Sequence, residues 1–187
     1  MLVALSLVPM TIFIMFSKSD TLNEFKSKLF YEGNIPARLD YWQNGIDIFR
    51  DNAFFGVGPD QFQKYAGLYR DTNQVLRDGA FVIPDKAHNT MIDQFANGGI
   101  FIGILWCLVV LIISVQPLLA LRHEINLKNR FQIALLSAIW FSYIFQALIS
   151  PDQVQLSVLG FATGALLLRE CRIIRSPIHN VKIDRNT

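Results

Sequence analysis

The chain has 187 residues, of which 52% are apolar and only 17% are charged. That apolar share is higher than in an ordinary soluble domain. The formal net charge is only +2, and no nucleic-acid-binding motif is present, so nothing points to a nucleic-acid partner. The apolar excess is concentrated in four runs: Leu2–Phe16, Ile100–Leu121, Phe131–Ile149 and Val154–Leu168.

These runs predict membrane helices. A hydrocarbon core about 30 Å thick needs roughly 20 residues of helix, and the runs that begin at Ile100 and Phe131 reach that length. The first run is too short to span comfortably. It is also unlike a secretory signal peptide, because no basic residue precedes it and no small-residue cleavage site follows it. We therefore expect a truncated transmembrane helix there, and a chain that is the C-terminal fragment of a larger membrane protein.

Basic residues predict the orientation. Residues 121–130 and 169–187 are rich in Lys and Arg, whereas the connection at 150–155 has none. By the positive-inside rule the first two are cytoplasmic and the third is outside, which places the long polar segment outside as well. The expected fold is an all-α, polytopic membrane helix bundle with one large extracytoplasmic helical loop. Its expected domains are a transmembrane helix at 1–17, a catalytic loop with short amphipathic helices at 18–98, three transmembrane helices at 99–168 and a cytoplasmic tail at 169–187.

The clearest helical pattern in the outer loop follows Asn34, a residue type that can cap a helix. A stripe of apolar side chains then recurs at spacings of three and four: Leu39, Trp42, Ile46 and Phe49. Arg38 lies four residues before Trp42, so the two share one helix surface. The Gly56–Pro59 run should end this helix, and a second short one should follow it. Residues 70–86 show no clear period and are expected to form a mobile loop.

His88-Asn89-Thr90 should open the next helix, with Asp93 on its polar face, and Gly98-Gly99 permits a bend before the membrane. A histidine at the outer mouth of a helix bundle can act as a general base near neutral pH. Asn89 beside it could orient a hydroxyl group. The alternative is that His88 only caps the helix.

Arg38 is the other candidate for chemistry. A guanidinium group binds phosphate oxygens in a two-pronged way and keeps its charge at all physiological pH values. The alternative is an arginine that reaches to lipid headgroups. Arg70 and Arg77 could add positive charge for an anionic substrate, or they could simply be solvated. No spacing of ligand residues predicts a metal site.

Several segments together resemble the C-terminal half of the O-antigen ligase and polymerase superfamily. They are Arg38-Leu-Asp-Tyr-Trp42, Asn52-Ala-Phe-Phe-Gly-Val-Gly-Pro-Asp-Gln-Phe62, Ala87-His-Asn89 and Gly98-Gly99. The resemblance implies a membrane glycosyltransferase of the GT-C type in the inner membrane. It would move a glycan from undecaprenyl diphosphate to a lipid or glycan acceptor, without a metal or nucleotide cofactor.

By the same resemblance, Arg38 matches the arginine that holds the diphosphate, and His88 matches the histidine proposed as base or diphosphate contact. We expect Trp42, Asn89, Arg70 and Arg77 to contribute to substrate binding. The alternatives are an O-antigen or exopolysaccharide polymerase of the same superfamily, and a non-enzymatic polysaccharide export or transport protein. Transporters place ionisable residues within their spans, and the two long apolar runs have none in their interior.

Overall fold

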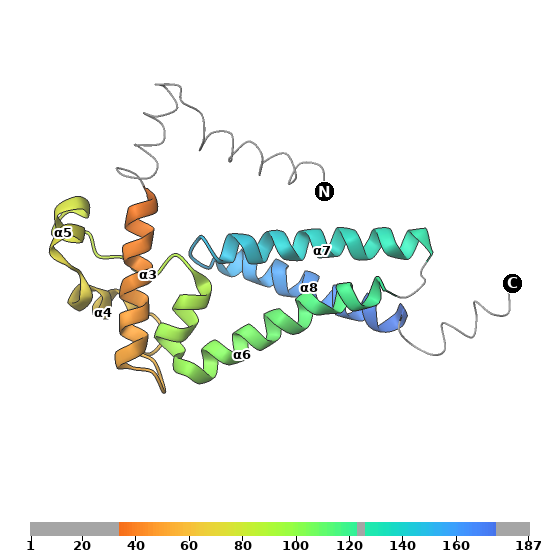
Figure 1. Cartoon of the computed structure of the whole chain (residues 1–187), viewed down its shortest axis with the longest axis horizontal. Coiled ribbons are helices and arrows are strands. Elements are labelled where there is room, and N and C mark those ends of the chain that lie inside the picture. Colours follow the sequence, from red (N-terminus) through yellow and green to blue (C-terminus); the bar gives the residue numbers. More distant parts are fainter. Residues whose placement is uncertain (1–33, 123–125, 175–187) are drawn as a thin grey trace, which may run out of the picture.

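The structure is a computed structural model, which describes residues 34–122 and 126–174. This part of the chain contains six helices and no strand, which confirms the all-α class for it. Figure 1 shows α6, α7 and α8 as one elongated bundle, with α3 standing across one end and α4 and α5 beyond it. The expected helix at 1–17 lies outside the described residues. The helices are α3 (Asn34–Asp51), α4 (Phe62–Tyr69), α5 (Thr72–Asp78), α6 (Thr90–Ala120), α7 (Leu127–Ala147) and α8 (Val154–Ile174).

Helix α6 consists of two parts that meet at a sharp break. Gly99 has a left-handed backbone (φ 68°, ψ −167°), so the polar arm 90–98 turns away from the apolar part that begins at Ile100. A Cβ atom at Gly99 would lie 2.3 Å from the carbonyl oxygen of Phe54, a distance that only glycine can accommodate. The bend expected from the Gly98-Gly99 pair is therefore confirmed.

The turn after α3 is bonded directly to this break. The amides of Val57 and Gly58 donate to the carbonyls of Ala96 and Asn97, at 3.0 and 2.9 Å. The amide of Ile100 donates in return to a carbonyl of the turn at 2.8 Å. Because the break leaves backbone groups without helical partners, these bonds satisfy groups that would otherwise be buried unpaired. They also fix α3 relative to the start of the membrane helix.

Within residues 34–122 and 126–174, two helices have the length and hydropathy to cross a membrane. They are Thr90–Ala120, with a mean hydropathy of 2.7, and Val154–Ile173, with 1.2. Only 17% and 22% of their apolar windows are buried within the protein, which is unlike the core helix of a soluble domain. Surfaces so apolar and so exposed require lipid or further protein to cover them. The third expected span, α7, is not one of these two helices; its first turn carries Lys128, Asn129 and Arg130, and Gln, Ser and Tyr side chains follow.

The described residues form two separate cores. The first joins α6, α7 and α8 around the fully buried Trp140, whose indole Nε1 donates to Ser114 Oγ at 3.0 Å. Gly160 of α8 packs against the ring of Tyr143, where a Cβ atom would lie 2.4 Å from the ring. The second core joins the outer helices to the polar arm of α6: Ile48, Phe62, Ala66, Ala87 and Ala96. The described residues 34–98 thus form a packed unit of their own, which we call the outer unit.

Two boundaries differ from the sequence-based expectation. Residues 70–86 are not a uniform loop, because α5 forms within them. Asp71 caps α5 by accepting a hydrogen bond from the amide of Gln74 at 2.6 Å. The buried Gln74 side chain in turn accepts a hydrogen bond from Asn44 of α3 at 3.1 Å. Helix α8 also continues past Leu168, the last residue of the fourth apolar run, to Ile174.

Candidate functional site

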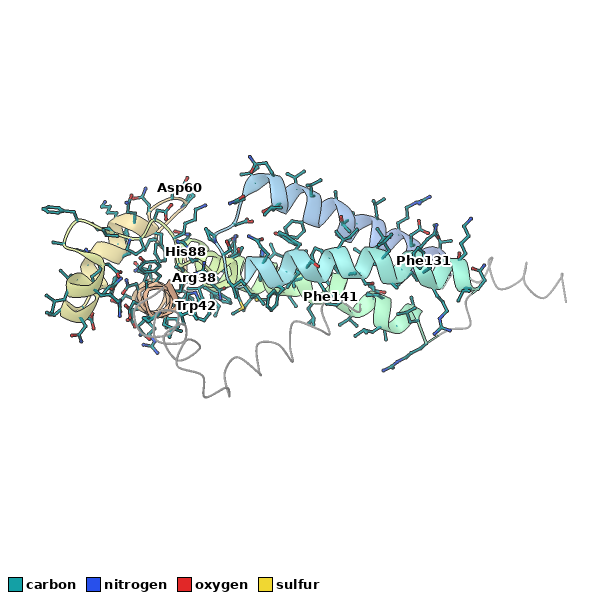
Figure 2. All side chains as sticks on the ribbon, turned by 90° about the horizontal axis from the view of Figure 1, so that it is seen from above. Arg38, Trp42, Asp60, His88, Phe131 and Phe141 are labelled. Atoms are coloured by element: carbon teal, nitrogen blue, oxygen red, sulfur yellow. The ribbon has the colours of Figure 1, made fainter. Side chains whose placement is uncertain are left out.

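Arg38 lies where the outer unit meets the membrane helices. It is half-buried on α3, one helical turn before Trp42, and its Nη1 donates to the backbone carbonyl of Ile149 just after α7. The end of a helix leaves carbonyl groups without partners and carries a partial negative charge, so a cation is favoured there. Figure 2 shows Arg38, Trp42 and His88 together at this end of the bundle, where α3 is seen end-on.

Lys86 makes a second contact of the same kind. Its Nζ donates to the carbonyl oxygen of Asp152 at 3.4 Å. Two cations from the outer unit, Arg38 and Lys86, therefore hold the connection between α7 and α8. Both contacts are made to backbone carbonyls of this connection and not to side chains of α7 or α8.

His88 has a backbone conformation that is uncommon for a residue other than glycine. Its φ of 58° lies in the left-handed region, where histidine, like asparagine and aspartate, occurs more often than most side chains. The buried Ala87 before it and the helix cap at Asn89 after it fix this conformation. The imidazole ring lies against the ring of Tyr41, with centroids 5.5 Å apart and planes at 47°. The side chain is thus held at a defined position rather than left to rotate in solvent.

The electrostatics around His88 favour its neutral form. Burial lowers the pKa of the imidazole below its usual 6.5, and the positive charge of Arg38 lowers it further. Asp85 opposes this shift and Lys86 reinforces it. The imidazole is therefore uncharged at neutral pH and can accept a proton. The influence of Arg38 on this pKa also means that the structure brings together two residues that are far apart in the sequence.

Two nitrogen atoms in this cluster have no hydrogen-bond partner within the described part of the chain. They are Nδ1 of His88 and Nε1 of Trp42. A buried polar atom without a partner costs about 1–3 kcal/mol. Both atoms belong to residues that the sequence singled out.

The other predicted site residues already have structural contacts. Asn89 is the N-cap of α6, where its Oδ1 accepts a hydrogen bond from the amide of Ile92 at 3.2 Å. Arg70 donates to the carbonyls of Gly79 and Ala80 at 2.7 and 3.1 Å. Arg77 forms ion pairs with Asp40 and Asp78. The helix cap is therefore Asn89 and not His88, and the two arginines stabilise the α3–α5 region. Their predicted role in substrate binding stays a prediction.

A polar pocket of about 220 Å³ adjoins the His88 segment, and we call it the Asp93 pocket. Its lining includes four carboxylates and one amine, from Asp60, Asp85, Asp93, Asp152 and Lys86. Thr90 and Asn97 of the polar arm of α6 line it as well. Thr90, Asp93 and Asn97 recur at spacings of three and four, and this polar stripe beside His88 is the signal that could have revealed the pocket from sequence.

Comparison with known proteins bears on this arrangement. The model of a family described as O-antigen ligase matches residues 1–107, which is more than half of the chain and includes Arg38, His88 and Asp93. No curated protein gives a significant match. The matched range contains the whole outer unit and the first part of the apolar helix, so the site described above lies inside it. The chain therefore belongs to the O-antigen ligase family of membrane proteins, which acts in polysaccharide biosynthesis.

Proposed function

We propose that this protein transfers a glycan from undecaprenyl diphosphate to a hydroxyl group of an acceptor, as an O-antigen ligase does. The observation that carries the proposal is the pairing of Arg38 with a neutral, half-buried His88. The pair lies where the polar outer unit meets helices with exposed apolar surfaces. A substrate with a polar glycan and a polyprenyl tail needs such a boundary, because each half dissolves in only one of the two media.

The two side chains have complementary roles in the proposed reaction. The bond between the anomeric carbon of the glycan and the diphosphate oxygen breaks, and the electron pair leaves with the diphosphate. The guanidinium group of Arg38 stabilises the charge that develops on this leaving group. A new bond forms between the anomeric carbon and the acceptor oxygen, and the imidazole of His88 takes the acceptor's proton. No metal or nucleotide enters this scheme.

Arg38 can bind the diphosphate without leaving its place. A guanidinium has five N–H donors, and the described residues accept a hydrogen bond from only one of its nitrogens, at the Ile149 carbonyl. The remaining donors form the fork that matches phosphate oxygens. The contact with Ile149 would therefore orient the fork, while the indole N–H of Trp42 offers one further donor nearby.

The proposed topology rests on the distribution of Lys and Arg along the chain. The outer loop at 18–98 lies on the periplasmic side of the inner membrane, α6, α7 and α8 cross the membrane, and the C-terminus is cytoplasmic. This orientation presents the site to glycans that have already been flipped across the membrane on their carrier.

The test uses the protein's own source organism, with the chromosomal gene deleted and variants supplied from a plasmid. Arg38→Ala and His88→Ala should abolish the polymer ladder on silver-stained gels of surface polysaccharide, at unchanged protein level in the membrane. Arg50→Ala is the matched control. Arg50 lies on the same helix, is exposed, and pairs only with Asp47 one turn away, so it should leave the ladder intact. Wild-type ladders in both site variants would overturn the proposal.

A polymerase of the same superfamily would break and form the same bonds, but its acceptor is another lipid-linked glycan. Incubating the purified protein with the donor and either lipid A–core or a second lipid-linked repeat distinguishes the two. A ligase gives a product only with the first acceptor.

A further inference from the structure

The Asp93 pocket is assembled from three parts of the chain that are distant in sequence. They are the turn around Asp60, the beginning of α6 and the α7–α8 connection at Asp152. Its volume of about 220 Å³ is below the roughly 300–1,000 Å³ of pockets that enclose drug-sized ligands. The pocket can therefore hold one small ring, and a longer oligosaccharide would have to extend out of it.

The walls of the pocket offer hydrogen-bonding atoms that the described residues do not use. Thr90 is fully buried and Asp93 is only 7% exposed, yet Thr90 Oγ1 and Asp93 Oδ2 have no hydrogen-bond partner there. Oδ1 of the half-buried Asn97 has none either. These atoms comprise one hydroxyl that can donate and accept, and two acceptors. A ligand that satisfies all three must itself carry several hydrogen-bond donors, as the hydroxyl groups of a sugar ring do.

The charge of the pocket selects against an anion. Four carboxylates face a single amine, and that amine, Lys86, already donates to the carbonyl of Asp152. A diphosphate would be repelled here, whereas Arg38 attracts it on α3. The phosphate and the sugar of one substrate would therefore be bound by different parts of the site.

One hydrogen bond connects the pocket to the residue before the proposed base. The amide of Ala87, the residue before His88, donates to Asp93 Oδ1 at 2.7 Å. Thr90 follows His88 by two residues, and Lys86 precedes it by two. A ring held by Thr90 and Asp93 thus lies next to the segment that fixes the left-handed backbone of His88.

We propose that the Asp93 pocket binds a single uncharged sugar ring of the glycan substrate, through its hydroxyl groups, next to the segment that carries His88. This inference rests on the proposed glycan transfer and adds the residues that recognise the sugar. The ring could belong to the donor glycan or to the acceptor, because both offer the same hydroxyl chemistry. Thr90, Asp93 and Asn97 are its binding residues.

Thr90→Val is the most informative variant. Valine has nearly the same shape, and it replaces an unpaired buried hydroxyl with a methyl group, so folding should not suffer. The full protein in nanodiscs is probed by saturation-transfer NMR with two ligands in turn. One is the free glycan repeat released from the lipid carrier by mild acid, and the other is the deacylated core oligosaccharide. Thr72→Val, at an exposed position on α5, is the matched control.

We expect wild-type protein to bind at least one of the two ligands, and the one that binds identifies the source of the ring. Thr90→Val should bind it about 3–10-fold more weakly, as expected for one lost hydrogen bond. Thr72→Val should bind it like wild type, because it removes no wall of the pocket. Failure of wild-type protein to bind either ligand, or equal binding by Thr90→Val, would overturn the proposal. Binding that depends on Thr90 in a protein that transfers no glycan would instead refute only the transfer reaction.

Discussion

Replacement of Asp93 by Asn is expected to stabilise the protein at pH 8, and to do so much less at pH 5. Asp93 lies on the polar arm of α6 before the Gly99 break, outside the apolar part of the helix. Burial raises the pKa of its carboxyl group from 3.8 to about 6, and the hydrogen bond from the Ala87 amide offsets only part of that effect. The folded protein therefore holds this proton more tightly than the unfolded chain does.

The sign and size of the change in the free energy of unfolding follow from that difference. Stability from this group is fully present below pH 3.8 and is lost as the pH rises through about 6. A shift of about two units corresponds to roughly 3 kcal/mol at pH 8, since one unit corresponds to about 1.4 kcal/mol. At pH 5, one unit below the folded pKa, the penalty that Asp93 imposes on wild-type stability is about 1.4 kcal/mol smaller than at pH 8. Asn cannot ionise, yet its Oδ1 can still accept the hydrogen bond from Ala87.

The assay is thermal unfolding of the purified protein in detergent at the two pH values. The advantage of Asp93→Asn over wild type should be larger at pH 8 than at pH 5 by about 1.4 kcal/mol. That corresponds to roughly 3–6 °C for a chain of this size. Asp60→Asn removes an exposed carboxylate of the same pocket and serves as the control for the loss of one negative charge there. An Asp93→Asn advantage that does not change with pH would refute the reasoning.

Three further outcomes follow from the structure. Gly99→Ala should prevent accumulation of folded protein, because its Cβ atom would clash with the carbonyl of Phe54, and fluorescence-detected size-exclusion chromatography would reveal this as loss of the monodisperse peak; a normal peak would contradict the break. Asn44→Ala should destabilise the protein by about 1–3 kcal/mol, since it leaves the buried side chain of Gln74 without its partner; an unchanged melting temperature would contradict the pairing. The rate of glycan transfer should fall to half at a pH below 6.5 as His88 becomes protonated, because burial and the neighbouring guanidinium lower its pKa; a midpoint above 6.5 would contradict a lowered pKa.

Features with local signals were the ones that the sequence predicted well. The apolar stripe from Leu39 to Phe49 predicted helix α3, because helical periodicity is a property of neighbouring residues. The Gly98-Gly99 pair likewise predicted the break in α6. Arg38 and His88 were selected by residue type and by resemblance. Their electrostatic coupling could be seen only once α3 and the polar arm of α6 were packed together.

Features that depend on tertiary contacts could not be predicted in this way. Helix α5 has only seven residues, and its buried residue is the polar Gln74, so no apolar period indicated it. Its stability comes from the hydrogen bond with Asn44, thirty positions earlier. Arg70 and Arg77 looked like free cations because their partners on α3 and at the end of α5 are set by the fold. The Asp93 pocket was missed for the same reason, since Asp60 and Asp152 come from distant segments.

The most direct test of the account is the affinity of the purified protein for undecaprenyl diphosphate, measured in nanodiscs by native mass spectrometry. Arg38→Gln removes the positive charge that we propose binds the diphosphate. Arg50→Gln removes a positive charge from the far end of the same helix. We predict that Arg38→Gln weakens binding at least tenfold and that Arg50→Gln changes it less than twofold. Equal affinities for wild type and Arg38→Gln would contradict the assignment of this site to a lipid-linked diphosphate.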